Sequence, residues 1–232
     1  MIGVKLIFPR ILVKWVFILC LPILLLTASI GWATNSLWLY KYGFEKYDIS
    51  QTTGLTDIKL EKTARGLISY FNSSEEYISK DGDPFELFNQ KEVVHLKDVK
   101  GLIRLDYWVL LGTLVYIFAY SGVSLFWRRG KYRRRLARMV VGGSSLTMTL
   151  MLALGLGTLL GFDQLFLQFH LLSFTNELWL LDPTKDYLIM LFPGGFFYDT
   201  ALICVLTTTG LAIIMGGVAG GYLLCSRKRT KA

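Results

Sequence analysis

Residues 107–138, YWVLLGTLVYIFAYSGVSLFWRRGKYRRRLAR, join an apolar run to a cluster of arginine and lysine. Residues 107–127 contain no charged side chain, and about 20 apolar residues are enough to cross a bilayer as a helix. In lipid, every backbone N–H and C=O must be paired within its own segment, so this run predicts a transmembrane helix. The basic cluster is then expected at one membrane surface.

Three further apolar runs are long enough to cross a membrane. The four spans are expected at about residues 11–39, 107–127, 139–160 and 201–225. The composition agrees, because 53% of the residues are hydrophobic, which is too many for a soluble domain with a solvated surface. Four such helices in 232 residues predict one all-α membrane domain over residues 1–232, a four-transmembrane-helix bundle with a small extracytoplasmic cap.

The basic residues predict the orientation of the spans. The N-terminus, the link at about 128–138 and the C-terminus carry 14 of the 25 basic residues and no acidic residue. Positive residues in short loops stay in the cytoplasm, so both termini and the link are expected there. The outer segments are then about 40–106 and 161–200. Since the basic residues adjoin the ends of spans, lipid headgroups explain them and nucleic-acid binding is not expected.

The first outer segment is expected to form the cap. Thr56 is predicted to cap a helix over about 57–71. The apolar residues with helical spacing are Ile58, Ala64, Leu67, Ile68 and Phe71. A turn is expected at 81–84, and residues 85–94 are expected to form either short strands or an apolar strip against the membrane. From Glu92 the pattern is again helical and leads into the second span.

The second outer segment is unusually apolar and aromatic for a loop, and it is expected to lie in or dip into the outer leaflet. Turns are expected at 182–183 and 193–195. Within or next to the spans, glycines recur four residues apart, a spacing typical of close helix packing. These pairs are Gly157 and Gly161, Gly216 and Gly220, and Gly217 and Gly221.

The chain has two histidines, His95 and His170, and both are predicted on the outer side next to a span. Histidine is the side chain whose unperturbed pKa lies near neutrality, so it is the usual proton carrier at physiological pH. Three interpretations are open: a catalytic pair, a metal site, and ordinary residues of the membrane boundary. A metal site needs a further acidic ligand. The candidates for that ligand are Glu92, Asp98 and Asp182.

Two stretches carry a family resemblance. Residues 169–197 read FHLLSFTNELWLLDPTKDYLIMLFPGGFF, and residues 92–99 read EVVHLKDV. Together with the four-span layout, they resemble the bacterial lipoprotein intramolecular transacylase family, Lit. By the match to these motifs, the family's two functional histidines correspond to His95 and His170.

The resemblance implies an acyltransferase of the bacterial plasma membrane. Its substrate is a lipoprotein whose N-terminal cysteine carries a diacylglyceryl thioether and a free α-amine. The enzyme moves the sn-2 acyl chain onto that amine and leaves an N-acyl lyso-form lipoprotein, by histidine acid/base catalysis at the outer leaflet. Membrane lipids are the other expected partners, and no metal or organic cofactor is expected.

Four more residues are expected to support the site or bind substrate. Asp98 is placed to orient the ring of His95, and Asn176 to donate to the carbonyl oxygen of the substrate. Trp179 and Asp182 belong to the matched motif, in the aromatic segment expected to receive the acyl chains. Two alternatives stay open: a lipid-ester hydrolase that uses the same histidines, and a non-catalytic membrane protein whose cap binds a partner.

Overall fold

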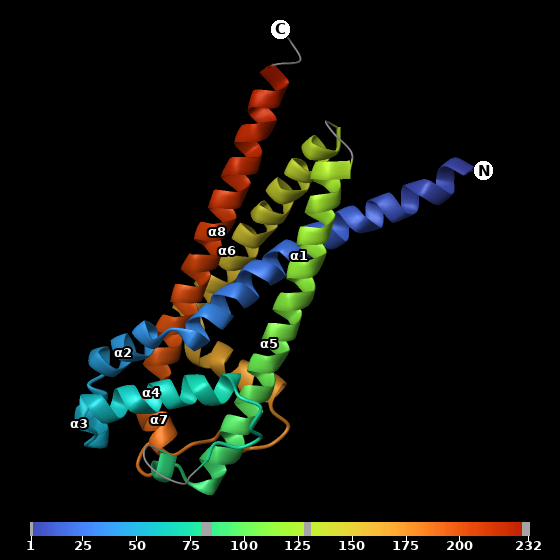
Figure 1. The fold of residues 1–232 in the computed structure, drawn as a ribbon. Helices are drawn as coiled ribbons and strands as arrows, with labels where there is room; N and C mark the ends of the chain where they lie inside the picture. The colour runs from blue at the N-terminus through green and yellow to red at the C-terminus, as the bar shows by residue number, and fades with distance from the viewer. Residues whose placement is uncertain (1, 80–84, 128–130, 229–232) are drawn as a thin grey trace. The chain divides into compact units, whose positions relative to one another are not determined.

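The computed structural model describes residues 2–79, 85–127 and 131–228, and these residues are helical without any strand (Figure 1). The all-α expectation is therefore confirmed. The long helices are α1 (Ile2–Asn35), α5 (Gln90–Gly122), α6 (Lys131–Ser173) and α8 (Gly194–Lys228). The short elements are α2 (Leu37–Lys46), α3 (Ile49–Thr53), α4 (Asp57–Asn72), η1 (Phe85–Leu87), η2 (Val123–Trp127) and α7 (Tyr187–Leu191).

In the described part of the chain, four helices are long and apolar enough to cross a membrane, as predicted. Their limits differ from the predicted ones. The first span was expected to reach residue 39, but α1 ends at Asn35 because the backbone of Ser36 is extended, with φ −86° and ψ 93°. Helix α5 begins at Gln90, before the predicted start at 107, and gives way to η2 at Val123, whereas α6 extends beyond its predicted span at both ends. The predicted turn at 81–84 and link residues 128–130 lie outside the described residues.

The chain forms two compact units. Unit 1 comprises Met1–Ser29, Tyr107–Leu156 and Cys204–Ala232, and unit 2 comprises Ile30–Asp106 and Gly157–Ile203. Unit 1 therefore holds most of the apolar runs that predict the membrane spans. Unit 2 holds both predicted outer segments, including the two histidines.

Unit 1 has an apolar core in which α1 packs closely on α6. Phe17 and Leu21 of α1 and Met139 of α6 are buried together. A Cβ at Gly143 would lie 2.8 Å from Leu21 Cδ2 and 3.3 Å from the carbonyl oxygen of Ile18. The glycine therefore lets the two backbones approach where any side chain would separate them.

The close packing predicted for the paired glycines is found at some of these positions and not at others. A Cβ at Gly216 would lie 3.0 Å from Ser144 Cβ, and one at Gly157 would lie 3.1 Å from Leu165 Cδ1, so both are closely packed. At the remaining positions a Cβ would meet no atom within 4 Å, and the predicted close packing is wrong there. These are Gly161, Gly217, Gly220 and Gly221.

In unit 2, α2 packs against α3 and α4, and α3 packs against α7 (Figure 1). The predicted cap of α4 is confirmed, because Thr56 Oγ1 accepts a hydrogen bond from the backbone N–H of Lys59 at 3.4 Å. The buried face includes Leu60, Ala64 and Leu67. Ile58 was assigned to this face wrongly: it is 83% exposed, because it lies about 200° around the helix from Leu60.

The expectation of short strands in residues 85–94 is wrong. Phe85–Leu87 forms a single 3₁₀ turn, and Val93 and Val94 lie in the first turns of α5. A capping box explains this early helix start. Asn89 Oδ1 accepts from the N–H of Glu92 at 3.1 Å, and Glu92 Oε2 accepts from the N–H of Asn89 at 2.7 Å.

Two glycines of unit 2 lie directly under aromatic rings. A Cβ at Gly43 of α2 would lie 2.3 Å from Phe196 Cδ2, and one at Gly195 would lie 2.5 Å from Tyr47 Cε1. Gly43 of α2 therefore faces a ring of α8, and Gly195 at the start of α8 faces the ring of Tyr47, the residue that follows α2. The contact holds the residues that follow Pro193 close to α2.

The close approach at Gly143 can be tested with its neighbour as control. Gly143→Ala is expected to lower the thermal unfolding midpoint of the purified protein by several degrees, because overpacking costs about 1–3 kcal/mol. Gly142→Ala places its Cβ 3.5 Å from Ile18 Cδ1, an ordinary contact, and is expected to leave the midpoint unchanged or slightly higher. Equal midpoints for the two variants would contradict the packing described here.

Candidate functional site

The two histidines of the chain lie side by side in unit 2. His95 is in the second turn of α5, and His170 is in the last turn of α6. Their ring centroids are 6.5 Å apart, and the ring planes are tilted by 25°. The side chains are only 7% and 8% exposed. Residues 75 positions apart in the sequence thus form one pair of imidazoles.

Aromatic rings surround this histidine pair. Phe174 contacts both imidazoles, with centroid distances of 5.1 Å to His95 and 5.6 Å to His170. Phe166 and Trp179 contact His170 at 4.3 Å and 4.9 Å. The predicted supporting residue Trp179 is therefore at the histidine pair. Such walls hold the imidazole rings in place and exclude water from one side of them.

A backbone hydrogen bond defines which nitrogen of His170 can act as a base. Nδ1 lies 2.7 Å from the carbonyl oxygen of Phe166, one turn earlier in α6. A carbonyl oxygen only accepts, so Nδ1 carries the proton, and in the neutral ring Nε2 keeps its lone pair. His95 differs, because its buried Nδ1 has no hydrogen-bond partner among the described residues.

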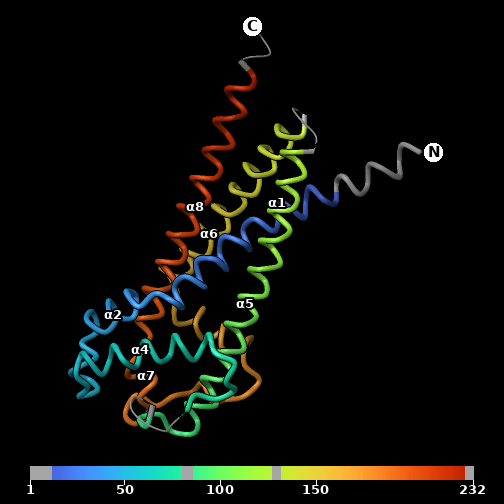
Figure 2. Tube along the Cα trace, in the orientation of Figure 1, coloured from blue at the N-terminus to red at the C-terminus, as the bar shows by residue number. Residues whose placement is uncertain are grey.

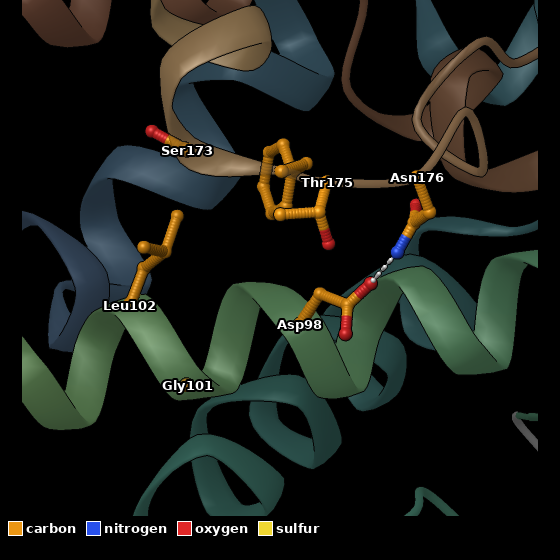
Figure 3. Close-up of a pocket in the computed structure, with 7 residues that line it drawn as sticks. Asp98, Gly101, Leu102, Ser173, Thr175 and Asn176 are labelled. Atoms are coloured by element: carbon orange, nitrogen blue, oxygen red, sulfur yellow. Dashed lines mark hydrogen bonds between the residues drawn. The ribbon is translucent and has the colours of Figure 1, made fainter.

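Asp98 and Asn176, both expected near the site, are bonded to each other (Figure 3). Asn176 Nδ2 donates to Asp98 Oδ2 at 2.9 Å, and Asn176 Oδ1 accepts from the N–H of Leu178 at 3.0 Å. Asp98 makes this bond in place of the expected one to His95. The pair ties α5 to the loop that follows α6, which Figure 2 shows as an irregular trace.

A pocket of about 280 Å³ lies between these two segments. It is lined by Asp98, Gly101, Leu102, Ser173, Phe174, Thr175 and Asn176. Phe174 belongs to both the pocket and the aromatic wall of the histidine pair, so the two adjoin. The sequence pattern did not single out this pocket, because its lining comes from segments more than 70 residues apart.

A buried carboxylate joins the start of α5 to the start of α7. Glu92 is 0% exposed, and its Oε1 accepts from the N–H of Leu188 at 2.6 Å, while Oε2 accepts from Asn89. Asn89 Nδ2 in turn donates to Asp186 at 2.7 Å. Glu92 was predicted as a candidate metal ligand and as the start of a helical pattern, and the Asn89–Glu92 spacing is itself the signal for a capping box.

The remaining predicted residue, Asp182, forms the turn that the sequence predicts at 182–183. Its Oδ1 accepts from the Thr184 hydroxyl at 2.7 Å and from the Thr184 N–H at 3.0 Å, and Lys185 pairs with Oδ2. These contacts, led by the hydroxyl of Thr184, hold the pKa of the Asp182 carboxyl well below its usual range. The structure thus uses this carboxylate within its own loop.

The chemistry that the site offers is proton transfer. No group of three or more histidine, cysteine, aspartate or glutamate side chains in the described part of the chain is placed to hold a metal ion. What the described residues bring together is a free imidazole nitrogen on His170, a second imidazole and an adjoining polar pocket. These are the parts expected of an acid/base site.

Comparison with known proteins identifies the family. The sequence model described as "Lipoprotein intramolecular transacylase Lit" matches residues 15–197. The solved structure of the membrane integral lipoprotein intramolecular transacylase Lit from Bacillus cereus superposes with a TM-score of 0.80 at 21% identity, over 94% of this chain and 97% of that one. A variant of the same protein with one histidine replaced by alanine gives 0.78 at 21% identity, over 97% and 99%.

A protein of Aquifex aeolicus, described only as uncharacterized, is 26% identical over 139 residues. That match spans 59% of this chain and 59% of the relative's length. The solved structures establish a shared fold, and the family match includes both histidines and the pocket. The chain belongs to the lipoprotein intramolecular transacylase family, Lit.

Proposed function

We propose that this protein moves the sn-2 acyl chain of a diacylglyceryl-modified N-terminal cysteine onto the α-amino group of the same cysteine. The product is an N-acyl lyso-form lipoprotein. The observation that carries the proposal is the histidine pair, with ring centroids 6.5 Å apart in a family of lipoprotein transacylases.

The reaction needs no net proton. The amine nitrogen forms a bond to the carbonyl carbon of the ester, and the bond from that carbon to the glycerol oxygen breaks. One N–H proton leaves the attacking amine, and the glycerol oxygen gains one. Two imidazoles suffice for this exchange, because a neutral imidazole accepts a proton near neutral pH and the imidazolium that forms gives it up again.

The hydrogen bond of His170 supports the role of base for this histidine. With Nδ1–H held by the carbonyl of Phe166, Nε2 accepts the proton from the attacking amine. His95 then serves the oxygen side, where its N–H donates a hydrogen bond to the developing oxyanion. The imidazolium of His170 then gives its proton to the leaving glycerol oxygen, which returns both histidines to their starting states.

The rest of the rate comes from positioning. Donor ester and acceptor amine are parts of one molecule, so the enzyme must mainly fold the substrate into an attacking pose. Such proximity supplies roughly 7–11 kcal/mol of the barrier. Rings such as Phe166, Phe174 and Trp179 provide an apolar wall against which the acyl chains and glycerol are held.

The site is expected at the outer face of the bacterial plasma membrane, with both termini in the cytoplasm. The charge distribution supports this orientation, because the termini and the 128–138 link are basic and contain no acid. A lipoprotein with a mature N-terminal cysteine presents that residue at the outer leaflet. The substrate and the histidines would then lie at the same surface.

The proposal is tested with a reporter lipoprotein in cells that otherwise make only the diacylglyceryl form. Mass spectrometry of the N-terminal peptide should show an unchanged total mass with one acyl chain on the amine. His170→Asn keeps an N–H donor near the Phe166 carbonyl but removes the base, and is expected to slow conversion by about 10²–10⁴-fold. His95→Ala should have a similar effect.

Leu172→Ala is the matched control, because Leu172 is close to His170 in sequence and exposed. This variant should convert the reporter as the parent chain does. An unmodified diacylglyceryl peptide from well-expressed, folded parent protein would refute the assignment. A peptide that has lost one acyl chain altogether would instead favour the ester hydrolase.

The orientation is tested by cysteine labelling in a chain whose Cys20, Cys204 and Cys225 are replaced by alanine. A membrane-impermeant maleimide is expected to label Ser74→Cys in intact cells, because Ser74 is exposed and lies in the first predicted outer segment. Ala232→Cys at the C-terminus should be labelled only after the cells are broken. The reverse pattern would place the histidines on the cytoplasmic side.

A further inference from the structure

The pocket beside the histidine pair carries an uncompensated carboxylate. Only Oδ2 of Asp98 is engaged, by Asn176, and Oδ1 accepts no hydrogen bond from the described residues. The hydroxyls of Ser173 and Thr175 are likewise without a partner in the described chain, and Figure 3 shows Thr175 and Asn176 on the same side of α5 as Asp98. The lining thus offers acceptors and one negative charge.

Nearby cations do not neutralise this charge. Lys97 is bonded to Glu76 and Tyr77, and Lys100 is buried against Ser73 and the carbonyl of Glu75. No lysine or arginine lines the pocket. Its chemical complement is a small group with several N–H donors and a positive charge, which describes a primary ammonium.

We propose that this pocket binds the α-amino group of the substrate in its ammonium form, with Asp98 as the counter-ion. The inference rests on the proposed function, which requires a primary amine at this site. Asp98 follows His95 by one helical turn, and Phe174 lines the pocket while touching both imidazoles. An ammonium held there is therefore beside both imidazoles, one of which, His170, takes the proton of the attacking amine.

Asn176 acts as a positioning residue for this contact. Its amide oxygen is held by the N–H of Leu178, so its Nδ2 is aimed at Asp98 Oδ2. The second oxygen of Asp98 is left for the ligand. The ammonium loses one proton to solvent before attack, and the attacking amine loses the next to His170. The pocket therefore contributes capture and placement of the amine, and the histidines contribute proton transfer.

Gly101 provides an independent way to close the pocket. A Cβ at this position would meet no atom within 4 Å, so a larger side chain grows into open space without displacing its neighbours. Gly101→Leu is therefore expected to fill the pocket and keep the fold, since leucine also favours a helix more than glycine does.

The test uses a lipopeptide whose two chains are ether-linked, so that no acyl transfer occurs. Its binding to the purified protein is compared with that of the same lipopeptide N-acetylated at the cysteine. The free-amine form is expected to bind about tenfold more tightly. Asp98→Asn still accepts the bond from Asn176 but has no charge, and it should bring the two affinities together.

Glu177→Gln is the matched control, because it removes a neighbouring charge that is exposed and does not line the pocket. This variant should keep the preference for the free amine. Gly101→Leu should weaken binding of the free-amine lipopeptide more than it weakens binding of the N-acetylated lipopeptide.

Two results overturn the inference: equal binding of both lipopeptides to the parent chain, and a preference that survives Asp98→Asn. The second result would mean that Asp98 only anchors the loop of Asn176. Acyl transfer to the reporter lipoprotein is measured separately, so failure of the pocket inference with retained transfer leaves the proposed function standing. Absent transfer with retained amine preference would refute only the function.

Discussion

The carboxylate of Glu92 is the contact on which the arrangement of unit 2 depends. It is fully buried, and its two oxygens accept backbone N–H groups from the starts of α5 and α7. A buried carboxylate without partners is costly, so these bonds are made together or not at all. They fix the α7 end of the loop that carries Trp179 and Asp182 to the start of α5, and so they help to place the wall behind His170.

Further contacts along α5 continue this attachment. Lys91 donates to the carbonyl of Leu180, and Asp98 accepts from Asn176, so one helix face holds the loop at successive turns. The first histidine lies on α5, and the second is carried by α6 immediately before the loop. The spacing of the imidazoles is thus supported by side-chain hydrogen bonds from α5 to the loop, one to a backbone carbonyl and one to a side chain.

The apolar runs and the basic ends were enough to predict four long helices, and the two motifs contain the two histidines that the structure brings together. The end of α1 at Asn35 was missed because Leu37 and Leu39 continue the apolar pattern. The bond between Asp98 and Asn176 joins residues 78 positions apart, and no local periodicity records such a pairing. Sequence patterns within one segment therefore predict the helices well, whereas contacts between side chains of different segments can be found only once the segments are placed in three dimensions.

The paired glycine–ring contacts between α2 and α8 have an evolutionary consequence. Gly43 leaves space for Phe196, and Gly195 leaves space for Tyr47. Neither glycine gains a side chain unless the ring above it becomes smaller, because the Cβ would lie within 3 Å of ring atoms. Among relatives, positions 43 and 196 should then covary, and so should 47 and 195.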